Sequence, residues 1–157
     1  MSLEDDMDVL REVPLFGQLD RDQLRLLAFG AEHRFLKAGE ILFRAEARAD
    51  AGFVVVSGEV ELHDGEGGER VVARAGRGSL LGEMALMTET RRPTTAVTAT
   101  DCDLIRIPRP LFRRMLLEYP AIAAALHARI RADLLAMTDR ITALSPAFED
   151  DDETERG

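Results

Sequence analysis

Short β-prone runs separated by glycines fill the middle of the chain and limit its fold more than any other feature. Each run is rich in Val, Ile, Leu, Phe or Thr, and Gly or a Gly pair stands between most of them. Such a texture predicts seven or eight short strands joined by tight turns, with a hairpin over residues 64–68. The predicted strands span residues 33–36, 41–43, 53–56, 59–62, 70–73, 94–98 and 104–107.

Helical patterns flank these strands on both sides. Residues 6–30 are helical in pattern, and Asp20, followed three residues later by Gln23, predicts the start of a second helix that Gly30 ends. After Pro108 a helix is predicted from Pro110 to Tyr119, and a longer one follows Pro120. The expected fold class is α+β: a β jelly roll or barrel of about eight strands, with N-terminal helices and a C-terminal helical pair.

The segment from residue 81 to residue 97 interrupts the series of strands with a short predicted helix and a pair of arginines. Gly82 follows an apolar pair, and the next five residues favour a short helix, whose first backbone N–H groups lack intrahelical partners and suit an anion. Arg91 and Arg92 follow, and a guanidinium matches a phosphate bidentately. Glu83 accepts hydrogen bonds only, which suits hydroxyl donors. The segment therefore predicts a small ligand that carries both a phosphate and a hydroxyl group.

The run Gly82-Glu83-Met84-Ala85-Leu86, followed by Arg92, resembles the phosphate-binding cassette of the cyclic nucleotide-binding domain family. The resemblance covers roughly residues 10–144. Over this range the chain is similar to the sensor domain of catabolite-activator-type regulators. It extends to the family's entry helix, central strand and last barrel strand, matched by residues 13–16, 53–60 and 104–107.

The resemblance implies roles for individual residues. Glu83 would hold the ribose 2′-hydroxyl, Arg92 would hold the cyclic phosphate, and the backbone at Gly82 and Ala85 would approach the ligand closely. The candidate ligand-binding residues are Gly82, Glu83, Met84, Ala85, Arg91, Arg92, Thr94 and Thr95.

Two positions depart from the family pattern. Pro93 stands where the family usually has a small residue, and proline has no N–H to offer a phosphate. Thr94 or Thr95 could supply a hydroxyl instead, and Arg91 could be a second counter-charge. Because Pro93 also lacks the threonine hydroxyl that accompanies cyclic GMP preference in relatives, cyclic AMP is the expected ligand, ahead of cyclic GMP. Ala45 stands where the family usually turns on a glycine.

A ligand-free interpretation stands beside this one. A Gly-Glu pair is common in proteins, and an Arg-Arg pair is most often a solvated loop face. The chain would then be a degenerate domain that keeps the fold and acts as a scaffold for protein interaction. Binding of cyclic nucleotide to the purified protein separates the two interpretations.

Length and charge restrict the class of protein. The 157 residues suit one domain, expected over residues 1–148, with an acidic, disordered tail over residues 149–157. The net charge of −9 argues against a broad nucleic-acid face. The N-terminus lacks the features of a signal peptide, and no apolar run is long enough to span a bilayer, so the expected location is cytoplasmic, without membrane contact.

Catalytic and metal chemistry have no clear signature in the sequence. Cys102 precedes an apolar stretch and is expected to be a small core or edge residue. A metal-binding jelly roll would need several converging histidines, whereas His33, His63 and His127 are isolated, and each is expected to be an ordinary surface or strand histidine. The chain is therefore expected to be a non-enzyme, without a metal.

The helix after Pro120 carries apolar residues at steps of three and four: Ile122, Leu126, Ile130, Leu134, Met137, Ile141 and Leu144. This stripe either packs on the chain's own barrel or forms a homodimer through a short coiled-coil seam. Arg129 and Arg131 are either base contacts or a solvated face. Proteins that resemble this domain usually join it to an effector, and we expect no DNA-reading element after the long helix. The expectation is therefore a stand-alone sensor that acts through an unknown effector protein or through dimerisation, without direct DNA binding.

Overall fold

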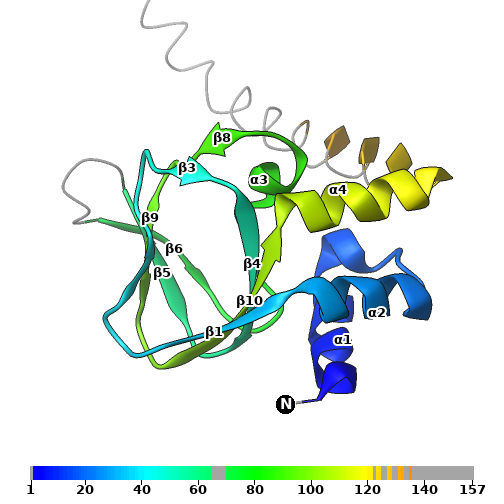
Figure 1. Ribbon diagram of the computed structural model, residues 1–157. Coiled ribbons are helices and arrows are strands. Elements are labelled where there is room, and N and C mark those ends of the chain that lie inside the picture. The colour runs from blue at the N-terminus through cyan, green and yellow to red at the C-terminus, as the bar shows by residue number, and fades with distance from the viewer. Residues whose placement is uncertain are drawn as a thin grey trace, which may run out of the picture.

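The computed structural model describes residues 2–64 and 70–121, together with residues 123, 124, 127, 128, 131, 132 and 135. Two groups of elements divide the molecule: the strands form one half, and helices α1, α2 and α4 pack against the outer face of one sheet (Figure 1). The short helix α3 lies between the two groups, at the end of strand β7.

Two four-stranded antiparallel sheets and one two-stranded ribbon make up the β half. The first sheet has the order β1-β10-β4-β7, the second has the order β2-β9-β5-β6, and β3 pairs with β8. The strands are β1 (Glu32–Leu36), β2 (Ile41–Phe43), β3 (Arg48–Ala49), β4 (Ala51–Ser57), β5 (Val60–His63), β6 (Val71–Ala75), β7 (Leu80–Leu81), β8 (Thr90–Arg91), β9 (Thr95–Thr98) and β10 (Cys102–Pro108).

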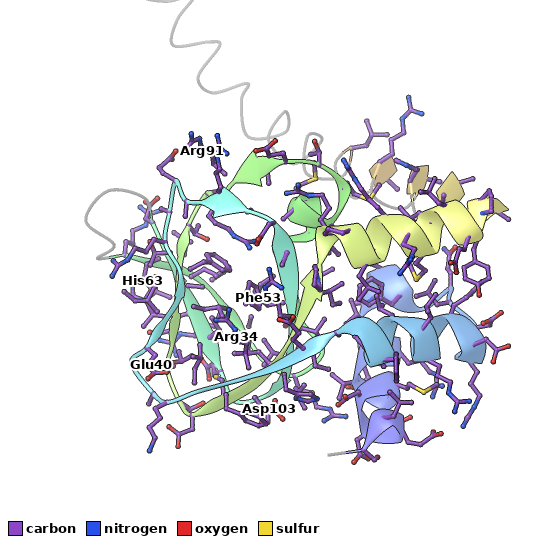
Figure 2. All side chains as sticks on the ribbon, viewed as in Figure 1. Arg34, Glu40, Phe53, His63, Arg91 and Asp103 are labelled. Atoms are coloured by element: carbon purple, nitrogen blue, oxygen red, sulfur yellow. The ribbon has the colours of Figure 1, made fainter. Side chains whose placement is uncertain are left out.

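The central strand β4 joins two hydrophobic clusters because successive side chains of a strand point to opposite faces. Phe53 and Val55 point into the space between the two sheets, and Figure 2 shows Phe53 in that space. Val54 and Val56 point to the other face and pack with the helices. Both faces of β4 are therefore covered, which explains why its first six residues are all buried.

The helices begin where local signals place them. They are α1 (Leu3–Glu12), the 3₁₀ turn η1 (Pro14–Phe16), α2 (Arg21–Gly30), α3 (Glu83–Met87) and α4 (Arg109–Glu118). The predicted start of α2 is confirmed, since the Asp20 side chain accepts from Gln23 N–H and the Gln23 side chain accepts from Asp20 N–H. Phe112 of α4 packs on Phe16 of η1, with ring centroids 6.0 Å apart.

The jelly-roll fold is confirmed, with two corrections. The described residues form ten strands in place of about eight, because β3 and β8 are two-residue strands too short to leave a periodic pattern. The sheets also do not close into a barrel: within the described part of the chain, β1 and β7 lie at the edges of one sheet and β2 and β6 at the edges of the other.

Several expectations fall outside the described residues. They are the turn over residues 65–68, the stripe residues Ile122, Leu126, Ile130, Leu134, Met137, Ile141 and Leu144, Arg129, and the tail over residues 149–157. The described residues between 120 and 135 are helical, and Arg131 is exposed. None of the helices in the described part of the chain has the length and apolar character needed to cross a membrane.

Candidate functional site

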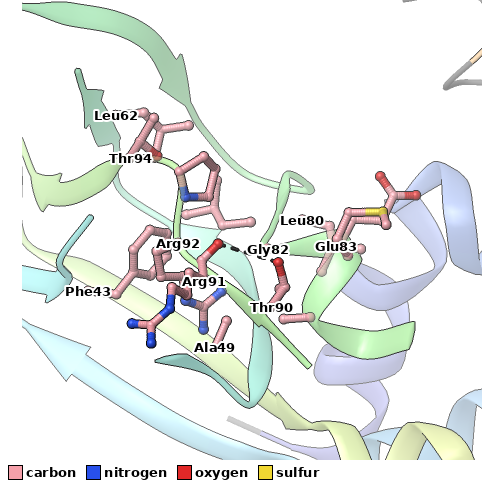
Figure 3. A pocket seen from close by; sticks show the side chains of 14 residues that line it. Phe43, Ala49, Leu62, Leu80, Gly82, Glu83, Thr90, Arg91, Arg92 and Thr94 are labelled. Carbon is pink, nitrogen blue, oxygen red and sulfur yellow. Dashed lines mark hydrogen bonds between the residues drawn. The ribbon is translucent and has the colours of Figure 1, made fainter. Parts of the chain in front are cut away.

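A cavity of about 370 Å³ opens between helix α3, the β8 segment and the second sheet. Its volume is within the range of small-molecule sites. Figure 3 shows the side chains that line it. The lining residues are Phe43, Ala49, Leu62, Leu80, Leu81, Gly82, Glu83, Met84, Ala85, Thr90, Arg91, Arg92, Pro93 and Thr94. Seven of the eight predicted site residues are therefore brought together around one cavity, and Thr95 is the exception.

Arg92 is the buried cation of this cavity, with only 4% of its surface exposed. Its Nη2 donates to the Ala51 carbonyl oxygen at 2.7 Å. The guanidinium carbon lies 4.3 Å from the centroid of the Phe43 ring and 5.6 Å from that of Phe53. These contacts fix the plane of the guanidinium group, and its other edge, at Nη1, lies against Gly82 in the cavity wall.

That other edge carries an unsatisfied donor. Arg92 Nη1 is buried and has no hydrogen-bond partner among the described residues. A buried donor without an acceptor raises the free energy of the folded state, and native structures keep few of them. Burial lowers the pKa of Arg92, nearby Asp50 opposes this shift, and Arg106 and Arg109 add to it. Because an arginine pKa starts so high, the group remains a cation at neutral pH.

Gly82 makes room for this arginine. Its backbone is left-handed, with φ of 79°, and it immediately precedes α3. A Cβ built on Gly82 would lie 2.2 Å from Arg92 Nη1. A glycine is therefore required at position 82 for two reasons. It adopts a backbone conformation that other residues rarely adopt, and it leaves space for the Arg92 donor.

Arg91 has a structural contact that the sequence did not indicate. Its Nη1 donates to the carbonyl oxygen of Glu46 at 2.9 Å, and its side chain is exposed while also lining the cavity. Glu46 is the residue with left-handed backbone in this loop, at φ of 70°, rather than Ala45, which stands where the family usually has a glycine. Glu46 N–H donates to the Arg92 carbonyl, and Arg92 N–H donates to the Ala47 carbonyl, which holds the loop beside the site.

The remaining predicted residues take different places. Ala85 is buried in the cavity wall, Met84 is 43% exposed, and Thr94 lines the cavity. Thr95 does not line it, since its Oγ1 accepts from Ala45 N–H at 2.9 Å. Glu83 lines this cavity and also the neighbouring hollow beside Glu12 and Arg77, and Figure 3 shows its carboxylate pointing away from Arg91 and Arg92.

Sequence reasoning missed the apolar lining of the cavity. Phe43 on β2 and Leu62 on β5 come from strands of the second sheet, and Leu80 and Leu81 form β7. A signal was available for Phe43 and Leu62, because each is a large apolar residue on a predicted short strand and must face either the core or a ligand. The site thus combines an apolar wall, a fixed guanidinium and a carboxylate, which suits an anionic ligand with one flat apolar part.

The candidate residues for other chemistry lie elsewhere. Cys102 is buried between the two sheets, as expected of a core residue. His33 on β1 bridges two carboxylates, His63 lies 3.6 Å from Glu61, and His127 is exposed. In the described residues, no three His, Cys, Asp or Glu side chains gather in a way that could hold a metal ion.

Known proteins with a similar sequence or fold belong to one family of ligand-binding domains. A family model described as "Cyclic nucleotide-binding domain" matches residues 33–119. A cyclic nucleotide-binding-like protein from Brucella abortus has a solved structure that is 45% identical, covers 71% of this chain and 97% of its own, and has a TM-score of 0.65. The regulatory domain of Toxoplasma gondii PKA, solved with cAMP, is 29% identical over 72% of this chain and 44% of its own, with a TM-score of 0.67.

Curated relatives are much longer than this chain. Neuropathy target esterase sws from Drosophila melanogaster is 33% identical over 121 residues, which is 75% of this chain. The chain spans only 8% of the length of that relative.

Proposed function

Because the chain belongs to the cyclic nucleotide-binding domain family, we propose that it binds a cyclic nucleotide in the Arg92 cavity. The observation that carries the proposal is the buried, unpartnered Nη1 of Arg92. A cyclic phosphate placed against Gly82 would give this donor a charged acceptor, and a charge-assisted hydrogen bond is stronger than a neutral one. The apolar wall formed by Phe43, Leu62 and Leu80 would then cover the sugar and the base.

The role of Glu83 follows from its position in this proposal. It lies at the start of α3 and lines the cavity on a different side from Arg92. A carboxylate there would accept from the ribose 2′-hydroxyl while Arg92 holds the phosphate. Its present orientation, away from both arginines (Figure 3), would then change by rotation of the side chain when ligand enters.

Titration of the purified chain with cyclic AMP tests the proposal. Charged hydrogen bonds contribute about 1.5–3 kcal/mol each, so Arg92→Ala should weaken cyclic AMP binding by about tenfold or more. Arg92→Met is the companion variant, because it keeps an apolar stem against Phe43, where alanine would leave a gap. Arg114→Ala is the matched control and should bind as tightly as the unmodified chain, since Arg114 is exposed on α4 and does not line the cavity. Equal affinity in all variants, or no binding by the unmodified chain, would refute the assignment.

Within this proposal cyclic AMP is preferred over cyclic GMP. The support is the residue after Arg92, which is Pro93, a cavity-lining residue without a hydroxyl. One structural neighbour was solved with cAMP, which shows what that protein holds. The same titrations, repeated with cyclic GMP as competitor, decide the preference. Tighter binding of cyclic GMP would assign a hydroxyl role to Thr94, which lines the cavity one residue later.

We also propose that the chain is a sensor module rather than an enzyme, located in the cytoplasm and acting through an effector protein. The matched region is a binding domain, and the esterase activity named for the Drosophila relative belongs to a protein of which this chain spans 8%. The alternative function is a ligand-free scaffold that keeps the same fold. The unpartnered Arg92 donor favours the ligand-binding function over the scaffold.

Homodimerisation through the helix after Pro120 remains a prediction from the sequence. Its apolar stripe has the three-and-four spacing of a short coiled-coil seam. Sedimentation of the chain with and without cyclic AMP is expected to give a dimer, and a Leu134→Glu, Ile141→Glu double variant is expected to give a monomer. If the unmodified chain is a monomer under both conditions, the dimer proposal is wrong and the apolar stripe packs within the chain instead.

A further inference from the structure

The ribbon formed by β3 and β8 places two arginines directly opposite each other. Arg48 is paired with Arg91 in its register, and Ala49 is paired with Thr90. Directly opposed residues of an antiparallel pair have their side chains close together on one face, and like charges in this arrangement are destabilising. The two strands have only two residues each, so the pair of arginines makes up half of the ribbon. An anion placed beside them would relieve this repulsion.

The acidic side chains near the ribbon neutralise it only in part. Arg48 Nη1 lies 3.8 Å from Glu89 Oε1, and the two side chains are 78% and 69% exposed. An exposed ion pair at this distance contributes little, because water screens it. Arg91 Nη1 donates to the backbone carbonyl of Glu46 rather than to a carboxylate. The segments 44–48 and 89–92 together carry four arginines and two glutamates, so they form a cationic surface on a chain whose net charge is −9.

This cationic surface adjoins the ligand cavity. Arg91 of β8 lines the cavity, and β8 contacts helix α3, which forms another part of the cavity wall (Figure 1). Hydrogen bonds hold the loop before β3 at the same place, since Glu46 N–H donates to the Arg92 carbonyl at 2.7 Å and Arg92 N–H donates to the Ala47 carbonyl at 2.8 Å. Arg44, at the start of this loop, is exposed. Exposed arginines therefore lie beside the cavity in which Arg92 is buried.

Resting on the proposed function, we propose that Arg44, Arg48 and Arg91 form an outer anion site, which captures the phosphate of an incoming nucleotide before the phosphate reaches Arg92. Charges of one sign beside a cleft concentrate ligands of the opposite charge and raise their association rate. The phosphate then moves inward, because the buried Arg92 guanidinium offers a donor without a partner among the described residues, in a site of low dielectric. The outer site therefore sets the association rate, while Arg92 sets the dissociation rate.

Stopped-flow association of a fluorescent cyclic AMP derivative with the full chain tests this proposal. In about 0.1 M salt, where exposed charges act over roughly 10 Å, the Arg44→Gln, Arg48→Gln double variant should associate about threefold more slowly than the unmodified chain. Its dissociation rate should be unchanged, because Arg92 remains in place. The difference in association rate should disappear in about 1 M salt, where screening shortens that range to roughly 3 Å. A contact that only shaped the cavity would instead change the dissociation rate at both salt concentrations.

The matched control is the Arg21→Gln, Arg25→Gln double variant, which changes the net charge by the same amount. Both arginines are exposed on α2, in the helical half of the molecule, so its association and dissociation rates should equal those of the unmodified chain (Figure 1). Equal slowing of association by both double variants would assign the effect to net charge and overturn the outer site. An unchanged association rate in the Arg44, Arg48 variant would also overturn it, while the titration of Arg92→Ala tests nucleotide binding separately. If the unmodified chain binds no cyclic nucleotide, the proposed function and the outer site are both wrong.

Discussion

Replacing Gly82 with alanine is expected to abolish measurable cyclic AMP binding and to destabilise the fold. The new Cβ would lie 2.2 Å from Arg92 Nη1, and Arg92 has little freedom to retreat because its guanidinium is packed on Phe43 and bonded to the Ala51 carbonyl. The left-handed backbone at φ of 79° adds about 1–2 kcal/mol to the free energy of the variant's folded state. The substitution therefore has two effects at once: it displaces the Arg92 guanidinium, and it strains the turn before α3.

A matched glycine separates the two effects. Gly39 has almost the same backbone, with φ of 86°, and a Cβ built there meets nothing within 4 Å. Gly39→Ala should lower the free energy of unfolding by about 1–2 kcal/mol and leave cyclic AMP affinity unchanged. Chemical denaturation and ligand titration of both variants provide the measurement. Full cyclic AMP affinity in Gly82→Ala would show that the close approach of Gly82 to Arg92 is not required for binding.

The site segment was predictable because its signals are local. The short helix after Gly82, the N-cap at Asp20 and the strand bounds near residues 41–43 depend on neighbouring residues, and the structure places them as expected. The strands β3 and β8 were not predictable, since each has two residues and is formed by pairing with the other, about forty positions away. Local sequence carries little information about such a pair.

Contacts that cross the fold were also missed. Arg109 has no local signal of its long-range contacts, in which its Nε donates to the Ala85 carbonyl and its Nη2 donates to the Ala49 carbonyl. The left-handed backbone at Glu46 could not be predicted, because glutamate rarely adopts that conformation. Hydrogen bonds with the Arg91–Arg92 segment hold it there. In both cases the partner lies far away in the sequence and near the cavity in space.

His33 gives the clearest example of a role that local sequence hides. The sequence predicts an ordinary surface or strand histidine, but its Nε2 lies 2.9 Å from the Asp6 carboxylate of α1 and its Nδ1 lies 3.0 Å from the Asp103 carboxylate of β10. Figure 2 labels Asp103 at the lower end of the strands, near α1. These acids are 27 and 70 positions away in the sequence. The imidazole between these two carboxylates links α1 to the sheet.

The stability of the chain is therefore expected to fall as the pH rises above the unfolded pKa of histidine, about 6.5. Burial alone lowers the pKa of His33, but its hydrogen bonds with Asp6 and Asp103 and the charges of these two acids outweigh burial, so the pKa is raised. A group whose pKa is raised on folding stabilises the fold fully below its unfolded pKa of about 6.5, and this stabilisation is lost as the pH rises through the folded value. Denaturation curves between pH 5.5 and pH 9, roughly the span around that titration, measure the loss.

Removing the imidazole should be costly at low pH. Asp6 and Asp103 are nearly buried, at 9% and 8% exposure, so His33→Ala would leave two carboxylates with little solvent, and we expect a loss of about 2–4 kcal/mol in the free energy of unfolding near pH 6. The pH dependence above should vanish in the same variant. The Asp6→Asn, Asp103→Asn double variant is the control, because it keeps the imidazole and removes the charges that raise its pKa, and it should also show a flat profile. An unmodified chain whose stability is constant or increases across this pH range would contradict the assigned charge state of His33.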